Sequence, residues 1–174
     1  MAELLRRARR DELAAVVDFY TAVIASLVGK KHHPAWSLEK YPTVDDLRSF
    51  VATGATHIFE HDGEIVGMVN LDSNFPPDYA HVPWGIALDP SQALAIHTFA
   101  VSPQFQGQGI GRRFIAAIID QARQTGYRAV RLDVYPINFP ACKFYESCGF
   151  DYRGQHRIAY PDVTKDFYIY EYQL

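Results

Sequence analysis

The segment at residues 102–113, SPQFQGQGIGRR, combines three evenly spaced glycines with two following arginines. Gly107, Gly109 and Gly111 let the main chain approach a bulky group and adopt φ values that a Cβ disfavours. N–H groups at the start of a helix, with the helix dipole behind them, bind phosphate groups. The spacing therefore predicts a phosphate-binding turn, with a tight packing turn as the alternative.

The glycine spacing distinguishes three kinds of phosphate-binding turn. A P-loop needs GxxxxGK followed by Ser or Thr, which the segment lacks. A dinucleotide-binding turn needs GxGxxG, but Arg112 follows Gly111 and the spacing is GxGxG. Asp133 lies about where a ribose-binding acid would stand, and alone it decides nothing. The third pattern, Q/R-x-x-G-x-G/A, is matched by residues 106–111, QGQGIG.

A second motif follows downstream and matches N-x-x-A-x-x-(F/L)-Y-x-x-x-G-F. Its residues are Asn138, Ala141, Phe144, Tyr145 and the pair Gly149-Phe150. In this order, the two motifs resemble the coenzyme A signature of the GNAT N-acetyltransferase superfamily over roughly residues 94–152. The resemblance implies an enzyme that moves an acetyl group from acetyl-CoA to a primary amine of a small-molecule or peptide acceptor.

The resemblance also implies which residues hold the cofactor. The main chain of Phe99–Val101 would bind the pantetheine arm as an added strand does, and the Val101 N–H would polarise the thioester carbonyl. Asn138 would contact the pantetheine region. The predicted cofactor-binding residues are Phe99, Ala100, Val101, Gln106, Gly107, Gln108, Gly109, Ile110, Gly111, Arg112, Asn138, Ala141 and Phe144.

Two side chains are candidates for proton transfer. Tyr145 stands at the family position of the general acid, where a phenol protonates the departing thiolate. Packing as a core aromatic beside Phe144 is the alternative. His97 interrupts the apolar run ALAIHTFAV and is suited to accept a proton from the amine, directly or through water. Some family members carry a glutamate in this strand, where Ala95 stands here, and a structural role for His97 stays open.

Periodicity predicts the elements that position these residues. Helices are expected at about 12–28, beginning at an Asp11 cap, at 43–54, beginning at Thr43, and at 108–125, with a short one capped by Asn138. Strands are expected at 56–61 and 64–72 around Asp62-Gly63, and as two aromatic strands at the end of the chain. Two further strands, at 93–101 and 129–135, are expected to be parallel and to form a βαβ unit with the helix between them. The fold class is α+β, a mixed, mostly antiparallel sheet of six to seven strands with helices on both faces, as in the GNAT acyltransferases.

The two long loops are candidates for the acceptor site, because loops carry specificity on such scaffolds. Core or surface packing is the alternative for each of their residues. The candidates in these loops are His32, His33, Trp36, Tyr41, Asp72, Tyr79 and Trp84.

Composition places the chain among ordinary globular proteins and restricts its partners. The 174 residues, 48% of them hydrophobic, predict one domain over residues 1–174. A net charge of -3 argues against a nucleic-acid partner, although Arg6, Arg7, Arg9 and Arg10 leave a basic arm as an alternative. We expect a cytoplasmic protein without a membrane span, a disulfide or a metal site.

Several alternatives stay open from the sequence. A non-catalytic acyl-CoA-binding sensor would need the same cofactor motifs, whereas a Ser-His-Asp hydrolase is disfavoured because the chain has no G-x-S-x-G elbow. The aromatic run FYIYEY is compatible with a homodimer through a sheet edge. The acceptor itself is not encoded in any recognisable motif.

Overall fold

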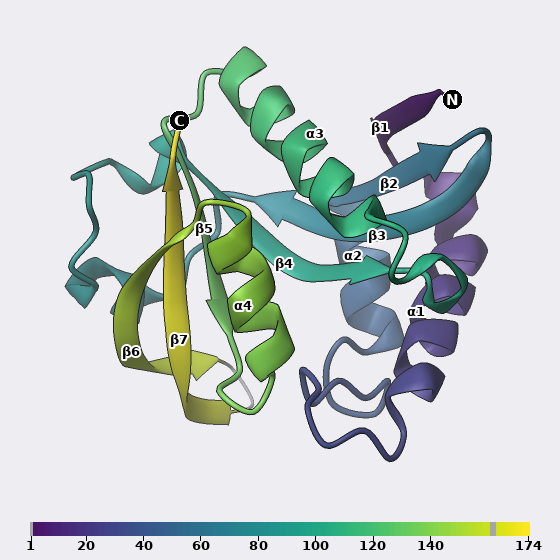
Figure 1. Ribbon diagram of the computed structural model, residues 1–174, viewed down its shortest axis with the longest axis horizontal. Coiled ribbons are helices and arrows are strands. Elements are labelled where there is room, and N and C mark those ends of the chain that lie inside the picture. Colours follow the sequence, from purple (N-terminus) through teal and green to yellow (C-terminus); the bar gives the residue numbers. More distant parts are fainter. Residues whose placement is uncertain (1, 161–162) are drawn as a thin grey trace. The chain divides into compact units, whose positions relative to one another are not determined.

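A seven-stranded mixed sheet organises the chain, as Figure 1 shows for this computed structural model, which describes residues 2–160 and 163–174. Its strand order is β1-β2-β3-β4-β5-β7-β6. Pairing is parallel between β4 and β5 and antiparallel in β1–β2, β2–β3, β5–β7 and β6–β7. The predicted fold class is confirmed. The strands are β1 (Glu3–Arg7), β2 (Thr56–His61), β3 (Glu64–Asp72), β4 (Ala93–Val101), β5 (Ala129–Val134), β6 (Asp151–Tyr160) and β7 (Val163–Gln173).

The helices of the described part are α1 (Leu13–Leu27), α2 (Val44–Thr53), α3 (Ile110–Gln124) and α4 (Phe139–Ser147). Helix α2 shows why the sequence signals worked. The Thr43 hydroxyl accepts the Asp46 N–H at 3.1 Å, the Asp46 carboxylate accepts the Thr43 N–H at 2.8 Å, and Gly54 ends the helix at φ +74°. None of the helices in the described residues is long and apolar enough to cross a bilayer.

Contacts divide the chain into two compact units. The first unit comprises the residues up to Lys30, Trp36–Leu71 and Ile96–Ile118, and the second comprises Lys31–Ala35, Asp72–Ala95 and Ile119–Leu174. Strand β4 therefore contributes its start to the second unit and its end to the first. The glycine turn of residues 106–111 belongs to the first unit, and helix α4 belongs to the second.

In the first unit, helices cover both faces of the sheet. The β2–β3 hairpin turns at Asp62-Gly63, where both residues have positive φ, as the sequence predicts. Val16 and Tyr20 of α1 and Leu47 of α2 pack on one face together with Ile58 and Met68. On the other face, Phe114 of α3 stacks on Phe59 with ring centroids 4.7 Å apart. The end of β4 is thus held between two packed layers.

In the second unit, β5 is the central strand. Ala93–Ala95 of β4 pair in parallel with Ala129–Arg131 on one side, and β7 pairs with β5 on the other. Helix α3 makes the crossover between these parallel strands, which confirms the predicted βαβ unit. The segment 73–92 lies over the β6–β7 hairpin, where Tyr79 and Val82 pack against Ile158 and Ile169.

A buried ion cluster fastens the segment 73–92 to β5 and β7. The Glu171 carboxylate is fully buried and accepts hydrogen bonds from Arg131 Nε and Nη2 at 3.1 and 3.0 Å. It also accepts the Gly85 N–H at 2.7 Å, while Arg131 Nη2 donates to the Ile86 carbonyl at 2.9 Å. The Trp84 ring covers the Arg131 guanidinium at 4.0 Å. Burial lowers the pKa of Arg131, which Glu171 opposes.

The amino-terminal segment differs from the prediction. Residues Glu3–Arg7 form the edge strand β1, which the sequence patterns did not indicate, and Asp11 does not cap a helix. Glu12 stands at the N-cap position of α1 but makes no side-chain capping bond there. Its carboxylate instead accepts the Arg9 N–H at 2.7 Å across the short 3₁₀ turn Arg10–Glu12, in which Asp11 lies. The helix α1 consequently starts at Leu13.

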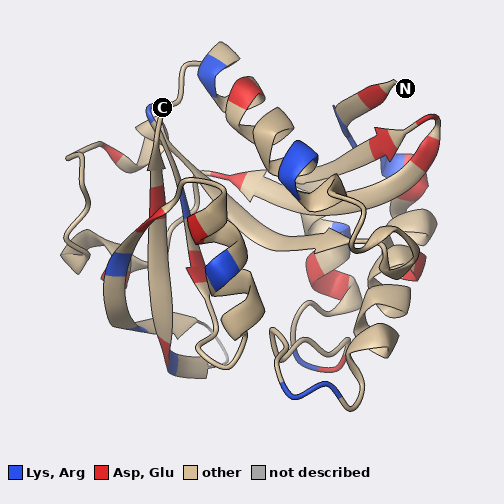
Figure 2. Cartoon of the chain, in the orientation of Figure 1, with Lys and Arg blue, Asp and Glu red and all other residues tan. Residues whose placement is uncertain are grey.

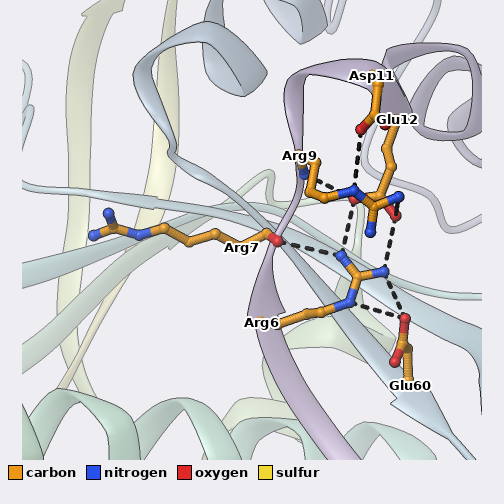
Figure 3. A network of polar contacts seen from close by, with 6 residues as sticks. All are labelled: Arg6, Arg7, Arg9, Asp11, Glu12 and Glu60. Carbon is orange, nitrogen blue, oxygen red and sulfur yellow. Dashed lines mark hydrogen bonds and ion pairs between the residues drawn. The ribbon is translucent and has the colours of Figure 1, made fainter.

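Two arginines of this segment, Arg6 and Arg9, pair with acids, as Figure 3 shows. The Arg6 guanidinium donates twice to Glu12, at 2.9 Å each, and to Glu60 at 2.9 and 2.6 Å. Arg9 pairs with Asp11 at 3.1 Å, while the Arg7 side chain points away from the network. The network joins β1, β2 and the start of α1, so Arg6 has a structural role in this unit.

Replacing Glu12 with Gln should lower the free energy of unfolding by about 1–2 kcal/mol at neutral pH, allowing for solvent screening. Hydrogen bonds from Arg6 lower the pKa of Glu12 from 4.5 to about 2 in the folded state. The contribution is therefore complete above about pH 4.5 and is lost as the pH falls through about 2. Urea unfolding of both proteins at neutral pH and near pH 3 measures this dependence.

The matched control is Asp11→Asn, whose ion pair with Arg9 is exposed on both sides. It should change the free energy of unfolding by less than about 0.5 kcal/mol. A Glu12→Gln difference in the free energy of unfolding that was the same at neutral pH and near pH 3 would contradict the role of the carboxylate charge.

Candidate active site

The turn between β4 and α3 has the geometry of an anion cradle. Gly107 and Gly109 adopt φ +79° and +75°, and both are exposed. An added Cβ at Gly107 would meet nothing within 4 Å, so the turn leaves open space beside its main chain. Gly111 lies in the first turn of α3 without a positive φ, so its N–H belongs to the helix start. Two of the three glycines, Gly107 and Gly109, thus adopt backbone conformations that other residues rarely take.

Side chains within the turn fix its shape. Gln106 Nε2 donates to the Val101 carbonyl at 3.4 Å, and Arg113 Nη1 donates to the Gln108 carbonyl at 3.2 Å. Arg113 also pairs with Glu3 of β1 at 2.6 Å, so this arginine links the turn to β1. Arg112 is exposed on the first turn of α3, beside the main-chain N–H groups that the motif predicts for phosphate.

The end of β4 departs from a regular strand. Thr98 is a β-branched residue with φ +50°, a conformation that is a genuine outlier for such a side chain. Its hydroxyl and carbonyl accept hydrogen bonds from buried groups of the same unit. Phe99, directly after it, packs its ring 4.8 Å from Phe114 of α3. His97, directly before it, is half-buried.

Helix α4 presents the second motif in the other unit. Asn138 is the N-cap residue, but its side chain makes no capping hydrogen bond. The turn is closed by the main chain instead, since the Asn138 N–H donates to the Tyr135 carbonyl at 2.8 Å. The Asn138 amide is therefore not used as the cap that the sequence predicts. Ala141 and Phe144 are half-buried on the same helix.

Tyr145 is buried in an aromatic cluster, with a relative exposure of 7%. Its ring lies 5.3 Å from Phe144, 5.5 Å from Phe150 and 6.4 Å from Tyr170. Burial, together with the nearby Cys148, Asp133 and Cys142, raises the pKa of Tyr145 above its ordinary value. The phenol therefore keeps its proton throughout the neutral range, and it also packs as a core residue.

The loop residues suggested for an acceptor site are mostly engaged in structure. The Tyr79 hydroxyl donates to Asp133 Oδ2 at 2.7 Å, and Tyr160 donates to the same oxygen. Asp133 is thus held by two tyrosines, which gives no support to a ribose-binding role. Trp84 covers Arg131, and the His32 ring Nδ1 lies 3.0 Å from the Ile137 carbonyl.

The charges near these elements are mixed. Figure 2 shows acidic and basic residues interspersed on the same elements, and α3 and α4 each carry both signs. Among the residues that the structure describes, no three His, Cys, Asp or Glu side chains are grouped as a metal site would require. The free Cys142 is buried and Cys148 is half-buried.

The arrangement is thus a glycine turn at a helix start, a distorted strand end before it, and a buried tyrosine on a separate helix. A profile described as the acetyltransferase (GNAT) family matches residues 7–150 of the chain. The chain belongs to this GNAT family. Family membership confirms the resemblance drawn from the two motifs and extends it from residues 94–152 to most of the chain.

Relatives in the sequence comparison include acetyltransferases of different kinds. The streptothricin acetyltransferase of Streptomyces lavendulae is 30% identical over 121 residues, or 70% of this chain and 53% of that protein. An uncharacterized N-acetyltransferase of Methanocaldococcus jannaschii is 33% identical over 151 residues, or 84% of this chain and 60% of that protein. This GNAT chain therefore spans little more than half the length of these relatives.

Solved structures share the whole fold at low sequence identity. A GNAT-family acetyltransferase of Streptococcus agalactiae superimposes with a TM-score of 0.81 at 19% identity, covering 99% of this chain and 95% of that one. A putative acetyltransferase of Salmonella typhimurium, solved with its cofactor acetyl-CoA, gives a TM-score of 0.66 at 18% identity, covering 99% and 94%. These similarities establish the GNAT fold.

Two buried polar residues near the candidate site are missed by the sequence patterns. Thr98 was read only as part of an apolar strand, and the buried Asn70 of β3 was not singled out. The signal was present, because a polar residue inside a run of buried strand residues needs hydrogen-bond partners. What the sequence lacks is the identity of those partners, which lie on other elements.

Proposed function

We propose that this GNAT protein transfers the acetyl group of acetyl-CoA to a primary amine by direct attack on the thioester. The observation that carries the proposal is the Gly107–Gly109 turn, whose positive φ values and open space stand at the start of α3. The family match and the Salmonella relative solved with acetyl-CoA support the cofactor. The residues present fit a pyrophosphate group at that helix start.

Acetyl-CoA would be held through both motifs. The main chain of residues 106–112 would receive the pyrophosphate, with Arg112 adding charge. Phe99–Val101 would bind the pantetheine arm through main-chain groups, and the Val101 N–H would stabilise the developing oxyanion. Asn138, whose side chain makes no capping bond, would contact the pantetheine region together with Ala141 and Phe144.

The transfer needs two proton movements. The neutral amine nitrogen attacks the thioester carbon, the C–N bond forms, and the C–S bond breaks. Tyr145 would give its proton to the departing thiolate, and His97 or a water it orients would take the proton from the amine. The raised pKa of Tyr145 keeps the donor protonated, and apolar surroundings raise the pKa of a thiolate in the same way.

The acceptor is proposed as a primary amine of a small molecule or a peptide. The relatives include a streptothricin acetyltransferase and, over shorter matches, alanine N-acetyltransferases named for a ribosomal protein. These names cover both acceptor classes, so the chain's own acceptor is sought by experiment. The segments 29–42 and 73–92 are the candidates for binding it, since loops carry specificity.

The proposed function is tested by thiol release from acetyl-CoA. Amino acids, polyamines, aminoglycosides and peptides with free amino termini are each supplied with the protein, and free coenzyme A is measured. We expect release that depends on one amine class, with a product heavier by one acetyl group. Acetyl-CoA binding without release for any class would contradict catalysis and indicate a binding module.

Gly107→Ala should weaken acetyl-CoA binding by about tenfold, equivalent to about 1.4 kcal/mol, because a Cβ would occupy the space meant for phosphate. Gly29→Ala is the matched control. Gly29 has φ +77° and, like Gly107, has nothing within 4 Å of an added Cβ. Both changes should therefore cost the same stability, about 1 kcal/mol, from the left-handed conformation.

Calorimetric titration with acetyl-CoA and thermal unfolding are measured for both variants. Only Gly107→Ala should lose affinity. If Gly29→Ala lost the same affinity for acetyl-CoA, or if neither variant lost any, the turn would not be part of the cofactor site.

A further inference from the structure

The strained residue Thr98 in β4 is the end point of a buried hydrogen-bond chain. Asn70 Nδ2 of β3 donates to Thr98 Oγ1 at 2.6 Å, and the Thr56 hydroxyl of β2 donates to Asn70 Oδ1 at 2.7 Å. The Tyr20 hydroxyl of α1 donates to the Thr98 carbonyl at 2.8 Å. The chain thus links four elements of the first unit: α1 and β3 contact Thr98 of β4 directly, and β2 reaches it through Asn70.

Every member of this chain is removed from water. Tyr20, Thr56 and Asn70 have relative exposures of 0%, and Thr98 has 7%. A buried polar group that loses its partner costs about 1–3 kcal/mol, so each member holds the others in place. Burial also raises the pKa of Tyr20, which keeps its hydroxyl protonated as a donor. The Asn70 amide orientation is fixed from both ends.

A residue with φ +50° and a branched Cβ costs about 1–3 kcal/mol and persists only where the surroundings enforce it. Here the enforcing groups are two donors, the Tyr20 hydroxyl and the Asn70 amide, which make three hydrogen bonds to the carbonyl and the hydroxyl of Thr98. Apolar side chains of similar shape could fill the same core positions, but they would leave the backbone of Thr98 free to relax into a regular strand.

The main chain after Thr98 is the stretch to which the proposed function assigns cofactor contacts. Phe99–Val101 follow directly, and the Ser102 N–H then donates to the Val66 carbonyl at 2.9 Å before the glycine turn. A change of φ at Thr98 redirects every later N–H and carbonyl of the strand end, because rotation about a backbone bond moves all that follows it.

We infer that Tyr20, Asn70 and Thr56 are positioning residues for acyl transfer, acting through Thr98 to aim the main chain of Phe99–Val101 at the thioester. This inference rests on the proposed function. None of the three touches the cofactor in this account. Their effect reaches the reaction only through the direction of the strand end.

The test compares two changes at Thr98 with a matched core variant. Thr98→Val keeps the shape and removes Oγ1, whereas Thr98→Ser keeps the hydroxyl. Ile58→Val removes one methylene group from the same core cluster, at a cost of about 0.5–1.5 kcal/mol of stability. Ile58 makes none of the hydrogen bonds that link Thr56, Asn70, Tyr20 and Thr98. Thr98→Val should weaken acetyl-CoA binding by about tenfold or more, and Thr98→Ser and Ile58→Val should stay within about threefold of the wild type.

Two measurements are made, so that the inference and the proposed function fail separately. Calorimetry gives the acetyl-CoA dissociation constant, and amide proton and nitrogen chemical shifts of residues 99–101 report the strand end without any ligand. Thr98→Val should shift these amides, whereas Ile58→Val should not. Wild-type protein that binds no acetyl-CoA would refute the proposed function, and unshifted amides in Thr98→Val would refute the positioning role.

Tyr20→Phe provides a second variant should Thr98→Val fold poorly. It removes one hydroxyl while the ring keeps its edge contacts with Phe19 and Trp36 at 5.5 and 6.2 Å. The same amide shifts and a loss of affinity in the same direction are expected. An affinity loss that merely followed thermal stability across all four variants would overturn the inference.

Discussion

Replacing Tyr145 with Phe should lower kcat for acetyl transfer by about a hundredfold or more, the range of a lost general acid. The dissociation constant for acetyl-CoA should change by less than about twofold, because only the hydroxyl is removed. The ring contacts with Phe144, Phe150 and Tyr170 all remain. Steady-state kinetics with the amine found by thiol release, and calorimetry, measure the two quantities.

Tyr170→Phe is the matched control for this prediction. It removes a hydroxyl from the neighbouring ring, one that donates to Glu146 at 3.0 Å, and it should leave kcat within about threefold of the wild type while costing about 1 kcal/mol of stability. Parallel losses of kcat and cofactor affinity in Tyr145→Phe would instead assign Tyr145 to packing. An unchanged kcat would exclude it as the proton donor.

Replacing Glu171 with Ala should lower the free energy of unfolding by about 3–5 kcal/mol, the cost of leaving a buried charge without its partner. Arg131 would keep its charge at 5% side-chain exposure, and the Gly85 N–H would lose its acceptor. The segment 73–92 should become more sensitive to proteolysis than the rest of the chain, because its attachments to β5 and β7 depend on this carboxylate.

Urea unfolding of Glu171→Ala and of Asp120→Ala compares the loss of a buried ion pair with the loss of an exposed one. Asp120 pairs with Arg123 at 3.3 Å, but both side chains are exposed, so its removal should cost less than about 1 kcal/mol. If the two variants lost equal stability, the buried ion cluster would not be what holds the segment 73–92.

Local patterns predicted the elements whose signals lie within a few residues. Asp62-Gly63 placed the β2–β3 hairpin, and Thr43 placed the start of α2, because turns and caps are closed by neighbouring groups. The glycine spacing and the block from Asn138 to Phe150 predicted the family, which the profile over residues 7–150 confirms. The roles of the individual site residues stay predictions.

Features that depend on remote partners were not predictable. Thr98 adopts φ +50° only because Tyr20 and Asn70, far away in sequence, reach it. Arg131 and Glu171 interrupt two alternating strands, yet their pairing follows from the β5–β7 register, which no local signal sets. The strand β1 is five residues long and mostly exposed, so its pattern is too weak to distinguish it from a loop.

Acetyl-CoA binding to the wild-type protein is the most direct test of the central claim that the glycine turn and the strand end form a coenzyme A site. Isothermal titration calorimetry should show one acetyl-CoA bound per chain, with a dissociation constant that Gly107→Ala raises and Gly29→Ala leaves unchanged. Absence of binding up to high micromolar acetyl-CoA, by a protein that is folded in the same buffer, would contradict it.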